Sequence, residues 1–208
     1  MNKWIFSAGL LVVAGSASAV TITFDEFGLA PSFFNNANPL RNEYAGIGAD
    51  FSGPGPLDGG AILDQAGNFG VNALSGNNFL AFNRNGTGAV QMLNGGHPFD
   101  PEQIDFSVNV NNVGVFASGG VFNGIFVLTA FDANNNFLGG NSIQTAVGQW
   151  GFLGFSSNIN IARVVLTEVS NADYFVYDDF SYDAVPEPAT MAALGLGVAA
   201  LLRRRRKN

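Results

Sequence analysis

Two adjacent aspartates near the end of the chain, Asp178 and Asp179, are its clearest candidates for chemistry. They lie in residues 174–182, which show the two-residue alternation typical of a β-strand. The alternation places Asp178 on the same side as Val176 and Phe180, which predicts a carboxylate that faces the core. Burying a carboxylate is costly unless it is paired with another group or bound to a metal. The pattern therefore indicates an ion-binding or strongly hydrogen-bonded position.

The predicted first strand, residues 20–24, runs directly into two further acids. In outline, an opening strand that ends in acids and a closing strand with paired aspartates resemble jelly-roll carbohydrate-binding modules. That resemblance implies that the terminal strands lie side by side and that a structural calcium sits where their acids meet. Two alternatives stay open: Asp178 pairs with Arg41 or Arg163, or it accepts hydrogen bonds from backbone amides. The acids that would bind the calcium are Asp25, Glu26, Asp178 and Asp179.

Aromatic side chains suggest a second kind of site. Sugar-binding sandwiches stack aromatic rings on pyranose faces, and polar amides reach the hydroxyl groups. Aromatic residues in strands more often pack in the core, and for Trp150 we favour core packing. The carbohydrate-binding candidates are Tyr44, Trp150, Tyr174 and Tyr177.

Catalytic groups are scarce. The only histidine, His97, lies in a Gly-Gly-His-Pro turn, and the sequence contains no Gly-x-Ser-x-Gly motif. A zinc site with several imidazoles is therefore excluded. A glycosidase requires two carboxylates, and nothing in the sequence singles out a pair. We predict no catalytic residue and no enzymatic activity.

Residues 132–139 begin like a calcium-binding loop, with oxygen-bearing side chains at the first, third and fifth positions. The pattern then fails, because the sixth position is Phe137 instead of glycine and the twelfth is Ile143 instead of glutamate. Asparagine tolerates left-handed backbone, so we interpret the segment as a tight turn that begins at Asp132.

These residues must be positioned by strands, because no stretch between residues 20 and 184 keeps a helical apolar period over three turns. Short apolar or alternating runs are separated by Gly, Asn, Asp and Pro. They predict an all-β fold, an antiparallel two-sheet β-sandwich of the jelly-roll or immunoglobulin-like type. Residues 53–78 are expected to form a loop, mobile or draped over one end. The predicted strands are residues 20–24, 46–51, 79–83, 89–93, 103–110, 113–117, 124–131, 150–155, 161–169 and 174–182.

Charge restricts the class of partner. Residues 20–184, 165 in all, carry three arginines against 15 of the 16 acids, which gives a net charge of −12. This segment contains no lysine, and the chain contains no cysteine. Such a surface repels nucleic acid and anionic lipid and favours divalent cations and neutral polymers. We expect one β-sandwich domain over residues 20–184, without disulfides and without a nucleic-acid partner.

The first 19 residues have the parts of a secretory signal peptide: a short cationic start, an apolar run over residues 4–15, and a small-residue cleavage site at Ala17 and Ala19. We predict export by the general secretion machinery and cleavage by signal peptidase after Ala19. The alternative, a buried N-terminal helix, explains neither the Ala-x-Ala pattern nor the strand-like residues that begin at Val20.

The last 24 residues, 185–208, combine a Pro-Glu-Pro motif, an apolar run and a cationic end. The 14 apolar residues 189–202 would form a helix about 21 Å long, shorter than the roughly 30 Å core of a bilayer. This segment can enter a membrane but is a poor permanent span. The cations should stay on the cytoplasmic side, with the body on the other side. The cytoplasmic stop consists of Arg203, Arg204, Arg205, Arg206 and Lys207.

The order of these three parts resembles the PEP-CTERM sorting signal of Gram-negative bacteria. The resemblance implies that an exosortase-type transpeptidase recognises Pro186, Glu187 and Pro188 and removes the tail. It also implies a link to exopolysaccharide and biofilm. The alternative is a short tail anchor that is never cut.

Together these features favour an exported structural protein of the cell surface or extracellular matrix, held briefly by its C-terminal helix. A carbohydrate-binding module that acts on exopolysaccharide is the second hypothesis. A secreted hydrolase is the third. Retention on a polysaccharide gel would separate the second from the first, and turnover that a single acid-to-amide change abolishes would establish the third.

Overall fold

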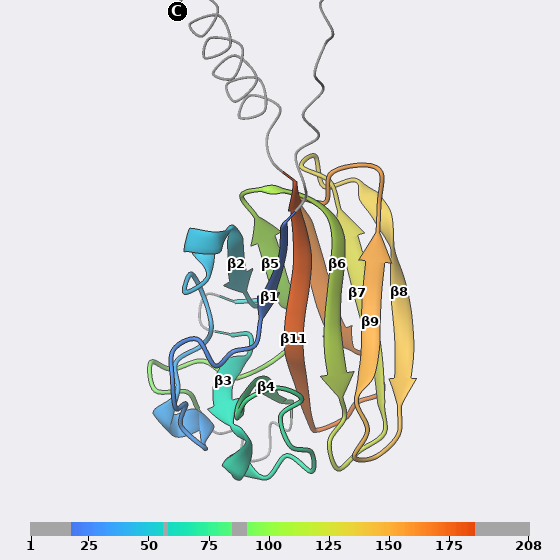
Figure 1. Cartoon of the computed structure of the whole chain (residues 1–208). Helices are drawn as coiled ribbons and strands as arrows, with labels where there is room; N and C mark the ends of the chain where they lie inside the picture. The colour runs from blue at the N-terminus through green and yellow to red at the C-terminus, as the bar shows by residue number, and fades with distance from the viewer. Residues whose placement is uncertain (1–17, 56–57, 85–90, 186–208) are drawn as a thin grey trace, which may run out of the picture.

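The computed structural model describes residues 18–55, 58–84 and 91–185, which form two antiparallel β-sheets packed face to face (Figure 1). We name them the front sheet and the back sheet, as they lie in that view. The front sheet runs in the order β3 (Ala61–Asp64), β4 (Asn78–Asn83), β11 (Tyr174–Val185), β6 (Asn109–Ser118) and β9 (Gly151–Ser156), and β1 (Ser18–Ile22) also pairs with β11. The back sheet runs in the order β2 (Ala49–Ser52), β5 (Glu102–Phe106), β10 (Arg163–Glu168), β7 (Gly124–Phe131) and β8 (Phe137–Thr145). The predicted two-sheet antiparallel sandwich is confirmed.

Consecutive strands mostly lie in different sheets. From β4 the chain crosses to β5, returns to β6 and crosses again to β7. Strands far apart in sequence therefore become neighbours, and β11 pairs with β1, β4 and β6. Three short 3-10 helices lie in the connections: η1 (Phe34–Asn36), η2 (Ala45–Ile47) and η3 (Gln65–Gly67).

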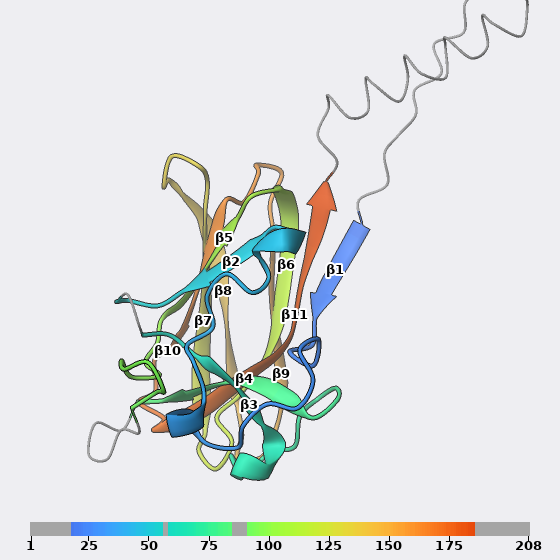
Figure 2. The same ribbon diagram turned by 90° about the vertical axis from the view of Figure 1, so that its left-hand side faces the viewer.

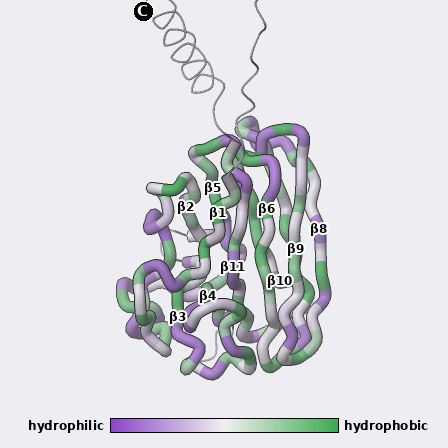
Figure 3. The backbone as a smooth tube through the Cα atoms, viewed as in Figure 1, coloured by the Kyte–Doolittle hydropathy of each residue, from purple (hydrophilic) through white to green (hydrophobic). Residues whose placement is uncertain are grey.

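The main core fills the space between the sheets and is largely aromatic. Phe82 and Phe175 stack with ring centroids 4.8 Å apart, and Tyr177 contacts Phe82 and Phe126 edge-on. All four side chains are fully buried. Aromatic burial on this scale supplies stability in a chain without disulfides. Figure 3 shows hydrophilic and hydrophobic residues mixed along the front strands, as expected for a sheet with one face on the core.

A second, smaller apolar cluster packs around β3 and β4, separate from the main core. Connecting segments, including η1, contribute to it and cover part of the front sheet. It contains Val176 of β11, and Tyr174 packs against it, so the two residues of β11 that alternate away from the main core before the aspartate pair both face this cluster. Its other members include Phe34, Ala37, Leu63, Phe69, Phe79 and Met92.

One predicted strand is in fact two. Residues 103–110 divide between β5 in the back sheet and β6 in the front sheet, and the chain turns at Ser107 and Val108. Ile104 and Val110 are both fully buried in the main core. Because the two sheets face the same core, apolar alternation continues across the crossing and hides the turn. The prediction of one continuous strand is therefore wrong.

Two strands escaped the sequence pattern. β3 lies within residues 53–78, which were predicted to be a loop, and β8 is a largely exposed edge strand. An edge strand with few buried side chains lacks the alternation that marks a strand. Conversely, part of the predicted strand at residues 89–93 is described, and residues 91–93 form no strand there. By contrast, β7 has the predicted bounds.

The described chain begins and ends at neighbouring positions. Ser18 pairs with Ala184 and Ala19 with Asp183, so β1 and β11 lie side by side, as Figures 1 and 2 both show. The adjacent terminal strands implied by the resemblance to carbohydrate-binding modules are therefore present. Among the described residues, no helix has the length and apolar character needed to cross a membrane. The predictions for Ala17, for Pro186, Glu187 and Pro188, and for residues 203–207 fall outside the described residues.

Candidate functional site

A β-bulge in β11 decides where the aspartate pair lies. Between Asp178 and Ser181 the pairing of β11 with β6 shifts register, and Asp179 adopts a left-handed φ of 47°. Tyr177 faces the main core before the bulge and Phe180 faces it afterwards. The extra residue reverses the alternation, so Asp178 lies on the outer side of the front sheet. The prediction that it points to the same side as Phe180 is wrong for this reason.

Asp178 is nevertheless fully buried, because residues 74–78, which we name the latched segment, cover it. Its Oδ2 accepts hydrogen bonds from the backbone N–H groups of Leu74 at 2.7 Å and Ser75 at 3.4 Å. Its Oδ1 accepts one from the N–H of Asp179 at 2.8 Å, and the Ser75 hydroxyl donates to Asp179 Oδ1 at 2.5 Å. Of the alternatives that the sequence left open, hydrogen bonding to backbone amides is the one that forms.

An acid that follows β1 holds the other end of the latched segment. Oδ1 of Asp25 accepts hydrogen bonds from the backbone N–H groups of Asn77 at 2.9 Å and Asn78 at 3.2 Å. Gly76 lies between the two amides that Asp178 holds and the two that Asp25 holds. It has a φ of 58°, and an added Cβ would lie 1.8 Å from Asp25 Oδ2. Only glycine fits this close approach. Acids from both ends of the domain thus converge on one segment.

Burial, which outweighs the amide hydrogen bonds, raises the pKa of Asp178 to about 7. Nearby, Oδ2 of Asp25 is buried and has no hydrogen-bond partner within the described residues. Across residues 18–55, 58–84 and 91–185, no three acidic, histidine or cysteine side chains converge as metal ligands. The structure brings Asp25, Asp178 and Asp179 around one segment without gathering them into a set of metal ligands. Calcium binding stays a prediction.

The structure corrects the sugar-stacking prediction for two of the four aromatic residues. Tyr44 is 3% exposed and Tyr177 is fully buried, so neither ring can stack on a sugar. The Tyr44 hydroxyl donates to Glu26 Oε2 at 2.9 Å. Glu26 is the fourth proposed calcium ligand, and this hydrogen bond engages one of its two carboxylate oxygens. Trp150 is half-buried against the second cluster, and its Nε1 donates to the carbonyl of Asn72 at 3.0 Å.

Tyr174 is the remaining aromatic candidate, and it does reach a pocket. The pocket has a volume of about 330 Å³ and lies at the end of β11 farthest from the chain termini. Phe33, 62% exposed, forms part of its wall. The pocket thus combines rings with amide side chains, as a sugar site requires. Its polar lining residues are Ser32, Asn68 and Asn83.

The segment after β7 is the tight turn that the sequence predicts. Asp132 Oδ1 accepts hydrogen bonds from the backbone N–H groups of Asn134 and Asn136, both at 2.8 Å. Asn135 takes a left-handed φ of 62° and accepts a hydrogen bond from Arg163. Hydrogen bonds from Asn136 lower the pKa of Asp132. His97, the only imidazole, stacks on Phe99 with centroids 5.2 Å apart.

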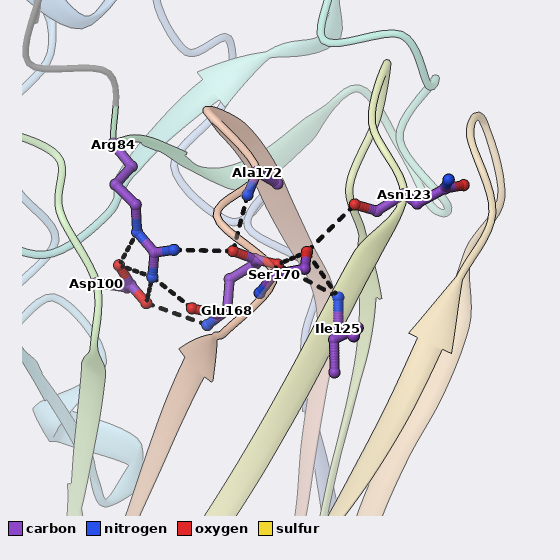
Figure 4. A network of polar contacts seen from close by, with 7 residues as sticks. All are labelled: Arg84, Asp100, Asn123, Ile125, Glu168, Ser170 and Ala172. Atoms are coloured by element: carbon purple, nitrogen blue, oxygen red, sulfur yellow. Dashed lines mark hydrogen bonds and ion pairs between the residues drawn. The ribbon is translucent and has the colours of Figure 1, made fainter.

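Sequence reasoning missed a buried polar network that joins the sheets (Figure 4). Arg84, directly after β4, forms ion pairs with Asp100 at 2.6 Å and with Glu168, at the end of β10, at 2.9 Å. The fully buried Glu168 also accepts hydrogen bonds from the backbone N–H groups of Ser170 at 2.8 Å and Ala172 at 3.0 Å. The available signal was the scarcity of cations: Arg84 is one of three between residues 20 and 184.

The comparison with protein families gives one match. Residues 184–207 match the family described as the PEP-CTERM protein-sorting motif. The sorting signal that the sequence predicts is thereby confirmed. A motif of this kind implies export, a C-terminus that is anchored transiently in the membrane, and exosortase processing. No curated protein matches the chain.

Several solved structures are similar to the described body at low identity. The K2 adhesin domain of Lys-gingipain is 11% identical, with a TM-score of 0.49, 79% of this chain covered and 99% of that one. A DUF4465 family protein from Bacteroides caccae is 13% identical, with a TM-score of 0.47, 88% of this chain and all of that one covered. The xylan-binding CBM22-1 domain of Xyn10C from Paenibacillus barcinonensis is 12% identical, with a TM-score of 0.46, 84% of this chain and 99% of that one covered.

Proposed function

We propose that this chain is an exported structural protein of the cell surface or extracellular matrix, associated with exopolysaccharide. The observation that carries the proposal is where the sorting motif joins the fold. The motif starts at Ala184 in β11, and Ala184 pairs with Ser18 at the start of β1. The chain therefore enters and leaves the sandwich at one end (Figure 2). A signal peptide and a sorting helix attached there would hold the whole body on one side of the membrane.

The charge of the body supports the same assignment. With 15 acids and three arginines, residues 20–184 present a surface that repels anionic lipid and nucleic acid. A neutral polymer carries no such penalty. A domain stabilised by an aromatic core, without cysteine, also needs no oxidising enzyme after export. These properties fit a matrix component better than a membrane-bound or nucleic-acid-binding one.

The proposed N-terminal cut is compatible with the fold. Cleavage after Ala19 would remove Ser18 and Ala19 from β1 and leave the pairs of Val20 with Tyr182 and Ile22 with Phe180. Ile22 is fully buried, whereas Ala19 is exposed. The residue that anchors β1 to the core is thus kept. The proposed domain, residues 20–184, retains its terminal strand pair.

The mass of the mature protein from its native host tests the proposal. We expect an N-terminus at Val20 and a C-terminus close to Pro186–Pro188, with the protein outside the inner membrane. Replacing Pro186, Glu187 and Pro188 together with alanine should preserve the first cut and leave the cationic tail attached. Recovery of an uncut 208-residue chain from the cytosol would refute the proposal.

We propose separately that calcium binds where the acids that follow β1 approach the aspartate pair of β11. The buried Oδ2 of Asp25 has no hydrogen-bond partner among the described residues and lies close to the latched segment that Asp178 and Asp179 also hold, which supports this proposal. Millimolar calcium should raise the melting temperature of the wild type relative to EDTA, and Asp25→Asn should abolish the increase. An unchanged melting temperature in the wild type would refute calcium binding.

A further inference from the structure

The outer face of the front sheet carries an aromatic ring that lies on a pair of glycines. Gly114 of β6 and Gly154 of β9 are direct partners. An added Cβ would lie 2.6 Å from Phe152 Cζ at Gly114 and 2.8 Å from Phe152 Cε1 at Gly154. The ring thus occupies the space that two side chains would fill. Phe116 supports it from one side, with centroids 5.2 Å apart. Phe152 is still 55% exposed, so its other face is open.

Polar side chains border this ring in a groove of about 400 Å³, which we name the platform groove. Asn112 Nδ2 donates to Asp183 Oδ2 at 2.7 Å, and Asn141 Nδ2 donates to the carbonyl of Gly154 at 3.2 Å. These bonds fix both amides beside the ring. Asn112 Oδ1, the second oxygen of Asp183 and the hydroxyl of Ser156 retain hydrogen-bonding capacity toward a ligand.

The shape of the platform groove suits a polymer. Its lining residues come from β1, β11, β6 and β9, with Asn141 contributed by β8 of the back sheet. At a strand spacing of about 4.8 Å, the distance from β1 to β9 is about 14 Å, wider than a single sugar ring. Figure 1 looks directly onto this face, which no other described strand covers.

The chemistry of the groove selects the class of ligand. An open ring face flanked by amide, carboxylate and hydroxyl groups matches a pyranose, which presents an apolar C–H face and a rim of hydroxyls. The charged residue that lines the groove is an acid, Asp183, so an anionic polymer would be repelled. A protein partner would require a wider apolar patch than one phenyl ring provides.

We infer that the platform groove binds a neutral polysaccharide, with Phe152 stacked on a pyranose ring and Asn112, Asp183 and Ser156 hydrogen-bonded to its hydroxyls. The inference names the ligand of the proposed matrix protein and rests on that function for the encounter with polysaccharide outside the cell. It also moves the sugar site away from the four aromatic residues that the sequence suggested.

A phenyl ring on a glycine pair also stabilises a sheet, and the experiment must separate that role from binding. The full chain, purified in mild detergent, is run in native gels that contain soluble glucan, xylan or galactomannan, with alginate as the anionic polymer. We expect retardation by at least one neutral polysaccharide and none by alginate. Phe152→Ala should weaken the apparent affinity at least about tenfold, and Phe152→Tyr should retain it.

The matched control is Phe137→Ala, which removes a ring that is even more exposed than that of Phe152, from β8 in the back sheet, and should leave retardation unchanged. Should Phe152→Ala fail to fold, as judged by its thermal unfolding, Asn112→Ala tests the same groove, and we expect it to weaken binding.

The inference is overturned if the wild-type protein migrates without retardation in every neutral gel. It is also overturned if a folded Phe152→Ala variant is retarded as strongly as the wild type. If Tyr174→Ala loses binding while the Phe152 and Asn112 variants keep it, the sugar binds in the pocket that Tyr174 lines and not in the platform groove. Because no export is involved, failure here leaves the mass of the mature protein, and so the proposed export and processing, unaffected.

Discussion

The guanidinium of Arg84 lies 2.9 Å from Oε2 of Glu168 and thereby connects the end of β4 in the front sheet to the end of β10 in the back sheet. The Glu168 side chain is fully buried and that of Asp100, the second partner of Arg84, is 4% exposed. Two buried carboxylates thus share one cation. Further hydrogen bonds to backbone N–H groups complete the network, which closes the sandwich at this end (Figure 4).

Replacing the shared cation should destabilise the fold strongly. Arg84→Met leaves Asp100 and Glu168 buried without their partner, and we expect a loss of about 3–5 kcal/mol in the free energy of unfolding. Arg163→Met is the matched control, because Arg163 makes an exposed hydrogen bond to Asn135. That variant should lose no more than about 1 kcal/mol. Equal losses in urea unfolding of the two variants would contradict the role assigned to Arg84.

Stability should depend on pH through Asp178. Its pKa of about 7 in the folded chain exceeds the ordinary value of 3.8, so the folded state holds the proton more tightly than the unfolded state. The resulting stabilisation is complete below about pH 4 and is lost as the pH rises through about 7. The free energy of unfolding of the wild type should therefore fall relative to that of Asp178→Asn between these values, and the two should run parallel above about pH 8. A difference that stays constant from pH 4 to 8 would refute this expectation.

The bulge position, residue 179, should tolerate only residues that can adopt a left-handed backbone conformation. Asp179 has a φ of 47°, and its Oδ1 accepts a hydrogen bond from the Ser75 hydroxyl. Asp179→Asn keeps both the acceptor and a tolerance for left-handed backbone, so its melting temperature should stay close to that of the wild type. Asp179→Val loses both and should cost at least about 1–2 kcal/mol. Equal melting temperatures for the two variants would show that the left-handed residue bears no strain.

Substitutions at two glycines should distinguish the cost of a strained backbone from the cost of a steric clash. Gly28 and Gly76 both have positive φ, but an added Cβ meets nothing within 4 Å at Gly28 and meets Asp25 Oδ2 at 1.8 Å at Gly76. Gly28→Ala should therefore cost only the backbone term of about 1–2 kcal/mol. Gly76→Ala should cost clearly more in urea unfolding, because the latched segment must also move away from Asp25. A smaller cost at Gly76 than at Gly28 would mean that the segment is loosely held.

Local pattern was enough to predict most of the strands. Alternating and apolar runs gave β7 its bounds and located most of its neighbours, since a residue in a half-buried strand is apolar or polar according to the face it occupies. The order of the three parts at residues 185–208 likewise identified the sorting motif, because such a signal must be readable without the fold. The class of fold and the sorting motif were therefore available from the amino-acid sequence alone.

Only the tertiary structure decided which way several residues face. Alternation fixes sides only within one uninterrupted strand, and it cannot reveal the crossing at Ser107, where both sheets share a core, or the bulge at Asp179, which reverses every side chain after it. Phe152 carried no sequence signal of its own. Its ring can lie on the outer face of the front sheet because Gly114 and Gly154, 40 residues apart in sequence, become paired on neighbouring strands. Such long-range pairing follows from how the whole chain packs, and no local window of residues encodes it.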